Sequence, residues 1–146
     1  MESSRETDLD LEGYRALAEL RHQIRRFLHF SEEQARLHDI EPQQHQMLLA
    51  IKGLPEGARP TVGEIARRLQ IRHHSAVELA DRLTERGFIS RQPNAEDRRE
   101  IRLKLTAAGD RLLRKLSMAH RNELQNAGPA LRDALDAALR GTEREK

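Results

Sequence analysis

The 146-residue chain has no cysteine and no tryptophan, and its aromatic residues are one tyrosine and three phenylalanines. Without cysteine, the chain has no disulfide, no thiolate metal site and no cysteine-based redox switch. Because aromatic residues make up only 3% of the chain, a protein that binds single strands by stacking bases on aromatic platforms is not expected.

Long apolar runs are also missing, since no stretch approaches the roughly 18 consecutive apolar residues of a membrane span. The first six residues, Met1 to Glu6, lack the basic and then apolar pattern of a signal peptide. We therefore expect a cytoplasmic protein that has no membrane partner.

Motifs of catalysis and of metal binding are absent as well. The sequence has no nucleophile elbow, no phosphate-binding glycine loop and no acid-base pair at a convincing spacing, so neither an enzyme nor a cofactor is expected. Its seven histidines form no His-x-x-x-His pattern; His22 and His29 lie seven apart, and His38 and His45 flank a bend. Zinc ligands cluster more tightly than this, so we interpret the histidines as structural and predict no metal site.

Amphipathic helices are predicted before the centre of the chain. Apolar residues at intervals of three and four predict a helix from about Leu9 to about Leu37. Its roughly 26 residues would span about 40 Å, which exceeds the width of a small domain. Part of this helix should therefore pack against another chain. Pro42 suits the first position of the next helix, which ends near Gly53.

The stretch from Thr61 to Gly109 predicts a winged helix-turn-helix. Thr61 and Glu64 fit a capping box at the start of one short helix. A second helix-like run extends from His73 to Arg86 and stops at Gly87. Two predicted strands follow, residues 88–92 and 100–105, and a polar tip from Pro93 to Arg99 joins them into a hairpin.

After the hairpin, Thr106 is predicted to cap a helix that runs to about Asn126, where Gly128 and Pro129 break it. A last helix should then end near Gly141. The expected fold class is mainly α with a small β-hairpin wing. We expect one domain over residues 1–146, with the winged helix-turn-helix at 42–105, amphipathic helices at 9–40 and 106–141, and a disordered polar start over residues 1–8.

Basic residues are concentrated on the central module. Residues 61–106 contain ten basic and seven acidic residues, a net charge of +3, whereas the whole chain carries +2. Such a distribution favours binding to phosphates. A solvated surface of mixed charge would explain it equally well.

Five short segments of the module resemble one family. They are Glu64-Ile65-Ala66, Asp81-Arg82-Leu83, Arg86-Gly87-Phe88-Ile89 with Arg91, Asp97-Arg98-Arg99, and Leu105-Thr106-Ala107-Ala108-Gly109. In order and spacing they resemble the MarR family (multiple antibiotic resistance regulators) of bacterial transcription factors, over about residues 12–140. The resemblance implies a winged helix-turn-helix homodimer whose terminal helices intertwine. Its expected function is that of a transcriptional regulator, and a repressor in most such families, on a palindromic double-stranded DNA operator. One branch of the family senses peroxide through cysteine, which this chain lacks.

Candidate DNA-binding residues lie in the helix-turn-helix and at the wing tip. They are Thr61, Arg72, His73, His74, Ser75, Val77, Glu78, Arg82, Asp97, Arg98 and Arg99. The N-terminal residues of a recognition helix point into the major groove, where arginine, histidine and serine can bond to bases or phosphates. At the wing, arginine suits a narrow minor groove. By resemblance Arg99 is the inserted residue and Asp97 orders the tip.

Three points stay open at the recognition helix. The sequence departs from the family habit of a small hydroxyl residue near position 72 and an often basic residue near 78. Ser75 and Glu78 also fit a capping box, which would start the helix later than His73. Arg82 serves either a phosphate or an ion pair with Asp81 or Glu85.

A small-molecule effector is a further expected partner by resemblance, because the family's ligands often sit near the long first helix. Arg26, His29 and Phe30, next to Arg25, are its candidate contacts. The alternative function is a dimeric protein-interaction module whose winged helix no longer reads DNA.

Overall fold

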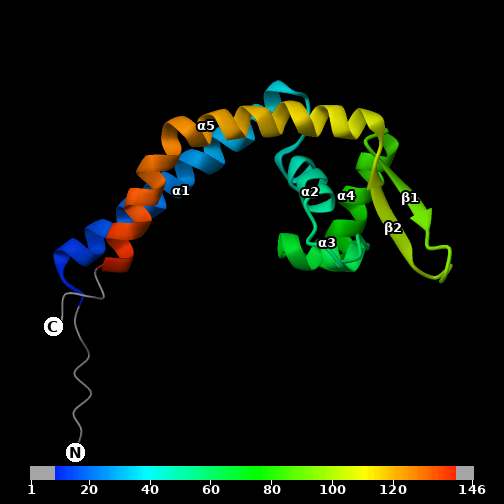
Figure 1. The fold of residues 1–146 in the computed structure, drawn as a ribbon, viewed down its shortest axis with the longest axis horizontal. Helices are drawn as coiled ribbons and strands as arrows, with labels where there is room; N and C mark the ends of the chain where they lie inside the picture. The colour runs from blue at the N-terminus through cyan, green and yellow to red at the C-terminus, as the bar shows by residue number, and fades with distance from the viewer. Residues whose placement is uncertain (1–8, 141–146) are drawn as a thin grey trace, which may run out of the picture. The chain divides into compact units, whose positions relative to one another are not determined.

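The computed structural model describes residues 9–140. Its elements are α1 (Leu11–Leu37), α2 (Pro42–Lys52), α3 (Val62–Leu69), α4 (His73–Glu85), β1 (Ile89–Pro93), β2 (Ile101–Leu105) and α5 (Ala107–Arg140) (Figure 1). The fold is mainly helical with one antiparallel hairpin, so the predicted fold class is confirmed. No helix within this part of the chain has an apolar stretch long enough to cross a membrane. The disorder predicted for residues 1–8 and the helix end predicted at Gly141 lie outside the described residues.

Two compact units divide the described chain. Residues 32–119 form one, which we call the winged-helix unit. Residues 9–31 and 120–140 form the other, the paired-helix unit. The dimerisation and DNA-binding roles expected of residues 9–40, 42–105 and 106–141 stay predictions.

The core of the winged-helix unit is made by apolar stripes from every one of its elements. α2 packs on α3, α4 and β2, and α3 packs on α4. The largest fully buried apolar side chains are Met47, Leu48, Ile65, Leu83, Ile89, Leu103 and Leu116. Each of these side chains lies on the apolar face of its helix or strand. Burial of each one stabilises the folded state by about 1.5–3 kcal/mol.

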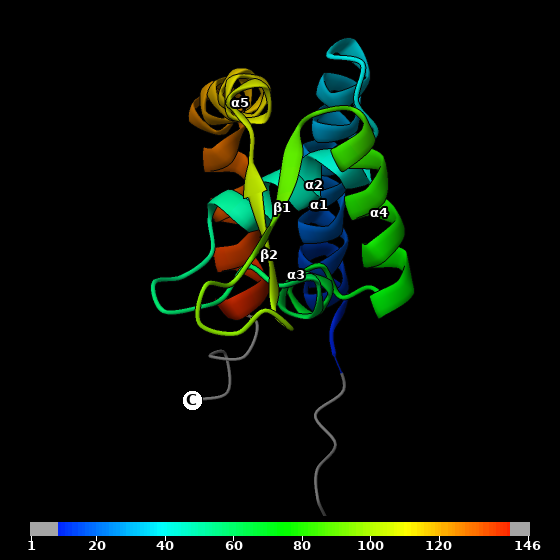
Figure 2. The ribbon, with the colours of Figure 1, turned by 90° about the vertical axis from the view of Figure 1, so that its right-hand side faces the viewer.

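The hairpin lies beside α3 and α4 in this unit (Figure 2). Its register pairs Ile89 with Leu105 and Pro93 with Ile101, so both strands start one residue later than predicted. Leu103 and Leu105 are buried while Lys104 is exposed, which is the expected two-residue alternation. The Leu103 amide also donates to the Pro60 carbonyl at 2.8 Å and thereby ties the α2–α3 loop to the hairpin.

Several helix ends in the winged-helix unit follow the predicted signals. Pro42 opens α2, and Gly87 after α4 has φ of +78°, which glycine adopts without strain. Thr61 Oγ1 accepts the Glu64 amide at 3.2 Å. The predicted return bond from the Glu64 carboxylate is wrong, because that carboxylate binds Arg67 and Arg68 instead.

The predicted break at Gly128 and Pro129 is also wrong, because α5 continues through both residues to Arg140. Proline inside a helix removes one amide donor and costs about 3 kcal/mol. The helix nevertheless continues, and Ala134 beyond the proline is buried in the paired-helix unit. At the start of α5 the Gly109 amide donates to Thr106 Oγ1 at 3.1 Å, as the predicted cap requires.

Within the paired-helix unit, His120 of α5 packs among three residues of α1. Its Nε2 lies 2.9 Å from Ser31 Oγ. The rings of Phe27 and Phe30 meet the imidazole edge to face, with centroids 5.9 and 5.3 Å away. Such aromatic contacts stabilise a helix pair beyond the area that they bury.

Candidate nucleic-acid interface

The helix α4, which is the predicted recognition helix, begins at His73 and not at a later turn. Arg72 is its N-cap, with extended backbone angles, and the Ala76 amide donates to the Arg72 carbonyl at 3.1 Å. The alternative start with Ser75 as the capping residue is therefore wrong. Ala76 is fully buried, and this packing requires the first turn to be helical already.

α4 has one buried face and one exposed face. Ala76, Leu79, Ala80 and Leu83 are buried against the core. Among the candidate residues, Ser75 and Val77 are half-buried. The exposed candidates are Arg72, His73, His74, Glu78 and Arg82.

The wing tip is ordered by short-range hydrogen bonds. Asp97 Oδ1 accepts the Arg99 amide at 3.0 Å, and the Asn94 amide donates to the Glu100 carbonyl at 2.9 Å. Arg98 and Arg99 are exposed. In both ribbon views the tip of the hairpin lies at the same end of the winged-helix unit as the start of α4 (Figures 1 and 2). One surface of this unit therefore presents both groups of candidate residues.

Basic side chains of the winged helix-turn-helix fall into two groups. Those already in ion pairs are Lys52, Arg59, Arg67, Arg68, Arg82, Arg86, Arg91 and Arg102. Within residues 9–140, the side chains of Arg72, Arg98, Arg99 and Lys104 make no hydrogen bond or ion pair, and neither do those of His73 and His74. The arginines without partners therefore lie at the start of α4 and at the wing tip, and Lys104 lies on β2.

Arg82 pairs with neither of its two predicted intramolecular partners. Its Nη1 lies 3.8 Å from Glu41 Oε2, so the predicted pairs with Asp81 or Glu85 are wrong. Asp81 instead binds Arg91 of β1. An exposed pair at 3.8 Å stabilises little, which leaves Arg82 available to a phosphate.

Two glutamates beside the candidate interface each bind two arginines. Glu100 binds Arg59 and Arg102, each at 2.9 Å, and the hydrogen bond from Arg102 lowers the pKa of its carboxyl group most. Glu64 binds Arg67 and Arg68, and the Arg67 hydrogen bond is the main cause of its lowered pKa. The pairing of Glu100 with Arg59 leaves no local sequence signal, because Arg59 lies 41 residues away along the chain.

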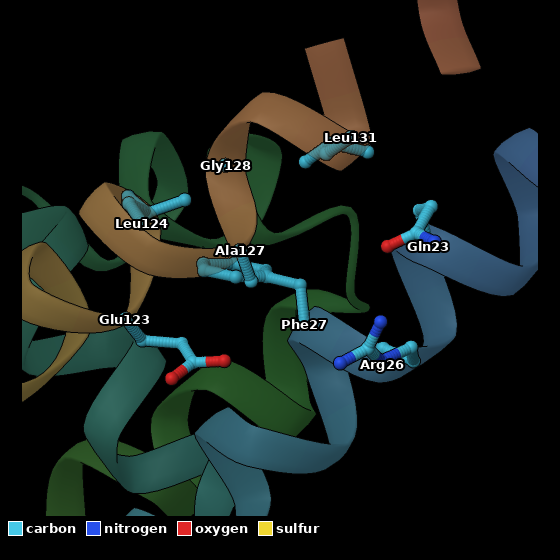
Figure 3. A pocket seen from close by; sticks show the side chains of 8 residues that line it. All are labelled: Gln23, Arg26, Phe27, Glu123, Leu124, Ala127, Gly128 and Leu131. Carbon is cyan, nitrogen blue, oxygen red and sulfur yellow. The ribbon is translucent and has the colours of Figure 1, made fainter. Parts of the chain in front are cut away.

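The three predicted effector contacts, Arg26, His29 and Phe30, do not line one common hollow. A hollow between α1 and α5 of the paired-helix unit has a volume of about 10 Å³ and is lined by Arg26 together with Phe27, Glu123, Leu124 and Gly128, among others (Figure 3). His29 and Phe30 do not line it. A larger, open cleft of about 370 Å³ lies in the winged-helix unit, where Leu54, Lys52 and Lys104 are among its walls.

Known proteins share this winged helix. The model of the MarR family matches residues 38–100. The transcriptional repressor MdtR of Bacillus subtilis is 36% identical over 63 residues, which make up 43% of this chain and 41% of MdtR. The chain spans less than half the length of the curated relatives that it matches.

Solved structures show the same fold at lower identity. A MepR mutant of S. aureus bound to an oligodeoxyribonucleotide has a TM-score of 0.63 and 21% identity, over 73% of this chain and 76% of that one. A MarR mutant of E. coli complexed with operator DNA has a TM-score of 0.59 and 23% identity, over 76% and 75%. Residues 38–100 of this chain therefore match the MarR family, and the chain shares the winged-helix fold of MarR structures.

Proposed function

We propose that the chain is a sequence-specific, double-stranded DNA-binding transcriptional regulator that acts as a homodimer on a palindromic operator, most simply as a repressor. The observation that carries this proposal is the gathering of cations without partners, Arg72, Arg98 and Arg99, on one surface of a MarR-family winged helix. The names of the relatives support it, since one is a transcriptional repressor and another a transcriptional regulator.

In this proposal the start of α4 enters the major groove and the wing tip enters the adjacent minor groove. Arg72, His73 and His74 contact bases or phosphates, while Arg82 contacts a phosphate. Ser75 and Val77 line the edge of the contact. Thr61 caps α3 and presents its hydroxyl group to the backbone of the duplex. Asp97 holds the turn from which Arg98 and Arg99 reach the minor groove.

A second copy of the chain is the proposed partner of the paired-helix unit. Its two helices leave large apolar side chains exposed: Leu11, Tyr14, Leu17, Leu28, Leu124, Leu135 and Leu139. Apolar surface of this extent on a water-facing helix pair favours association. Two copies related by a two-fold axis would match the two half-sites of a palindrome.

An effector is the remaining partner in the proposal. The hollow beside Arg26 holds about one water molecule, so a ligand there would have to separate the two helices of the paired-helix unit. The cleft of about 370 Å³ in the winged-helix unit has the size of a small-molecule site and is the better candidate.

Duplex binding as a function of salt tests the proposal. The protein is titrated onto its own upstream region and onto a random duplex of equal length, from about 50 to about 200 mM salt. A regulator binds the upstream duplex at least about a thousandfold more tightly, and its affinity falls steeply with salt. Equally weak binding to both duplexes would reject the regulator.

Arg99→Ala tests the wing, with Arg67→Ala as its matched control. Each cation withdrawn from the duplex lowers the slope of log K against log salt by about 0.9, so a dimer of Arg99→Ala should lose about 2. Arg67 is exposed on the same unit but already binds Glu64, so its removal should leave the slope nearly unchanged. The Arg99 variant should remain dimeric by sedimentation. Full affinity in this variant would reject the wing assignment.

One observation favours a second candidate, the dimeric protein-interaction module. Glu78, Asp81 and Glu85 are all exposed on α4, at spacings that place them on one face. An acidic face on a recognition helix repels phosphates, which would suit a basic protein partner instead. The salt titration separates the two candidates, because the module would bind both duplexes equally weakly.

A further inference from the structure

We propose that Glu78 is a specificity-determining residue of α4, and that its carboxylate selects a cytosine in each half-site of the operator. This inference rests on the proposed function. It names the base pair that one side chain of the recognition helix requires.

Glu78 sits where a recognition helix reaches base edges. It is the sixth residue of α4, on the second turn, and lies about 8 Å along the axis from His73. Its side chain is exposed, one turn after that of His74, and it is the only acidic residue among the first two turns. The buried stripe of Ala76, Leu79 and Ala80 lies on the other side of the helix. Docking of this helix therefore carries the carboxylate into the major groove.

The Glu78 carboxylate also has no partner among the described residues. Within residues 9–140 it makes no hydrogen bond or ion pair. Glu64 and Glu100, in contrast, each bind two arginines, and Asp81 binds Arg91. Among these acidic residues, Glu78 is the one whose oxygens are free to accept hydrogen bonds from a ligand.

A carboxylate in the major groove meets few groups that it can bind. Guanine presents N7 and O6 and thymine presents O4, all of which are acceptors that repel it. Adenine presents its N6 amino group beside the acceptor N7, an arrangement that suits an amide such as glutamine. Cytosine presents only its N4 amino group, which donates to a carboxylate. Glu78 therefore favours cytosine and acts against the other three bases through unpaired acceptors.

Selection from random duplexes by the full-length protein and by Glu78→Gln tests this inference. We expect the native protein to enrich a site with one fixed cytosine in each half, and Glu78→Gln to enrich adenine at that position with the rest of the site unchanged. Changing that cytosine to thymine in both halves should weaken the native protein by about 5- to 150-fold for each half-site.

Glu85→Gln is the matched control, because it removes the same charge from the same exposed face near the C-terminal end of α4. It should tighten binding to all duplexes without changing the preferred base. Circular dichroism spectra of both variants should match that of the native protein, since both side chains are exposed.

The outcomes distinguish the inference from the proposed function. If Glu78→Gln enriches the same site as the native protein and merely binds every duplex more tightly, Glu78 is only a repulsive charge and the inference fails while DNA binding stands. If neither protein enriches any sequence, the proposed function fails, and the inference fails with it.

Discussion

Replacing Gly109 by alanine tests the close contact between the first turn of α5 and the hairpin. A Cβ atom at this position would lie 2.0 Å from the carbonyl oxygen of Phe88 and 3.0 Å from its carbonyl carbon. Both are backbone atoms, and the same oxygen accepts the Thr106 amide at 3.0 Å. The helix or the hairpin would have to shift by about 1.4 Å to reach an ordinary contact distance.

The expected loss follows from three effects. Alanine is favoured over glycine inside a helix by about 1 kcal/mol. Forcing an extra methyl group into a tight contact costs about 1–3 kcal/mol. Weakening the bond between Thr106 and Phe88 costs about another 1 kcal/mol. Gly109→Ala should therefore lower the free energy of unfolding by about 1–3 kcal/mol.

Urea unfolding at fixed protein concentration, followed by circular dichroism, measures this difference. Gly63→Ala is the control, because Gly63 is also helical and belongs to the same compact unit, and a Cβ atom added there would meet nothing within 4 Å. It should leave stability unchanged or raise it by up to about 1 kcal/mol. The reasoning would be refuted if Gly109→Ala stabilised the protein as Gly63→Ala does.

Two further substitutions test the ion pairs of Glu100 and the proline of α5. Because its pKa is lowered in the folded chain, chiefly by Arg102, Glu100 stabilises the fold above its unfolded pKa and loses this effect as pH falls through the folded value. Glu100→Gln should unfold at lower urea than the native protein at pH 7, and the two curves should converge as pH falls below the folded pKa of Glu100; a constant gap would exclude the ion pairs as its cause. Pro129→Ala restores an amide donor inside α5 and should raise the melting temperature, with a gain of up to about 3 kcal/mol. An unchanged melting curve would mean that the helix already compensates for the missing bond.

Local patterns in the sequence predicted most elements, because the signals that form them lie within a few residues. The apolar spacing before Leu37, the proline at 42 and the alternation in residues 101–105 each led to the observed helix or strand. The same local view failed at Gly128 and Pro129, where a poor helix former lies within a helix that continues to the buried Ala134 and beyond. It also failed at Ser75, which fits a capping pattern but lies inside the first turn of α4. Burial of its neighbour Ala76 requires that turn to be helical.

The candidate residues of the site could be predicted from the sequence, but the ion pairs among its charged side chains could not. The arginines at the wing tip were recognisable from their place in a family pattern. Which arginines are already held by carboxylates was not, because the partners meet only in the folded chain. Arg59 and Glu100 lie 41 residues apart, and Asp81 and Arg91 come from different elements. Such pairs depend on the tertiary arrangement and leave no spacing to detect.

The bond from the Arg99 amide to Asp97 gives the hairpin tip its shape in the free protein. Because the backbone of the tip is already ordered, it would lose little conformational entropy on binding a duplex. The main entropy cost would come from fixing the long side chains of Arg98 and Arg99. An asparagine at 97 would keep the bond and remove one negative charge beside the proposed minor-groove contact, whereas an alanine would remove the bond that holds the turn. Comparing these two replacements would therefore separate what the shape of the tip contributes from what its charge opposes.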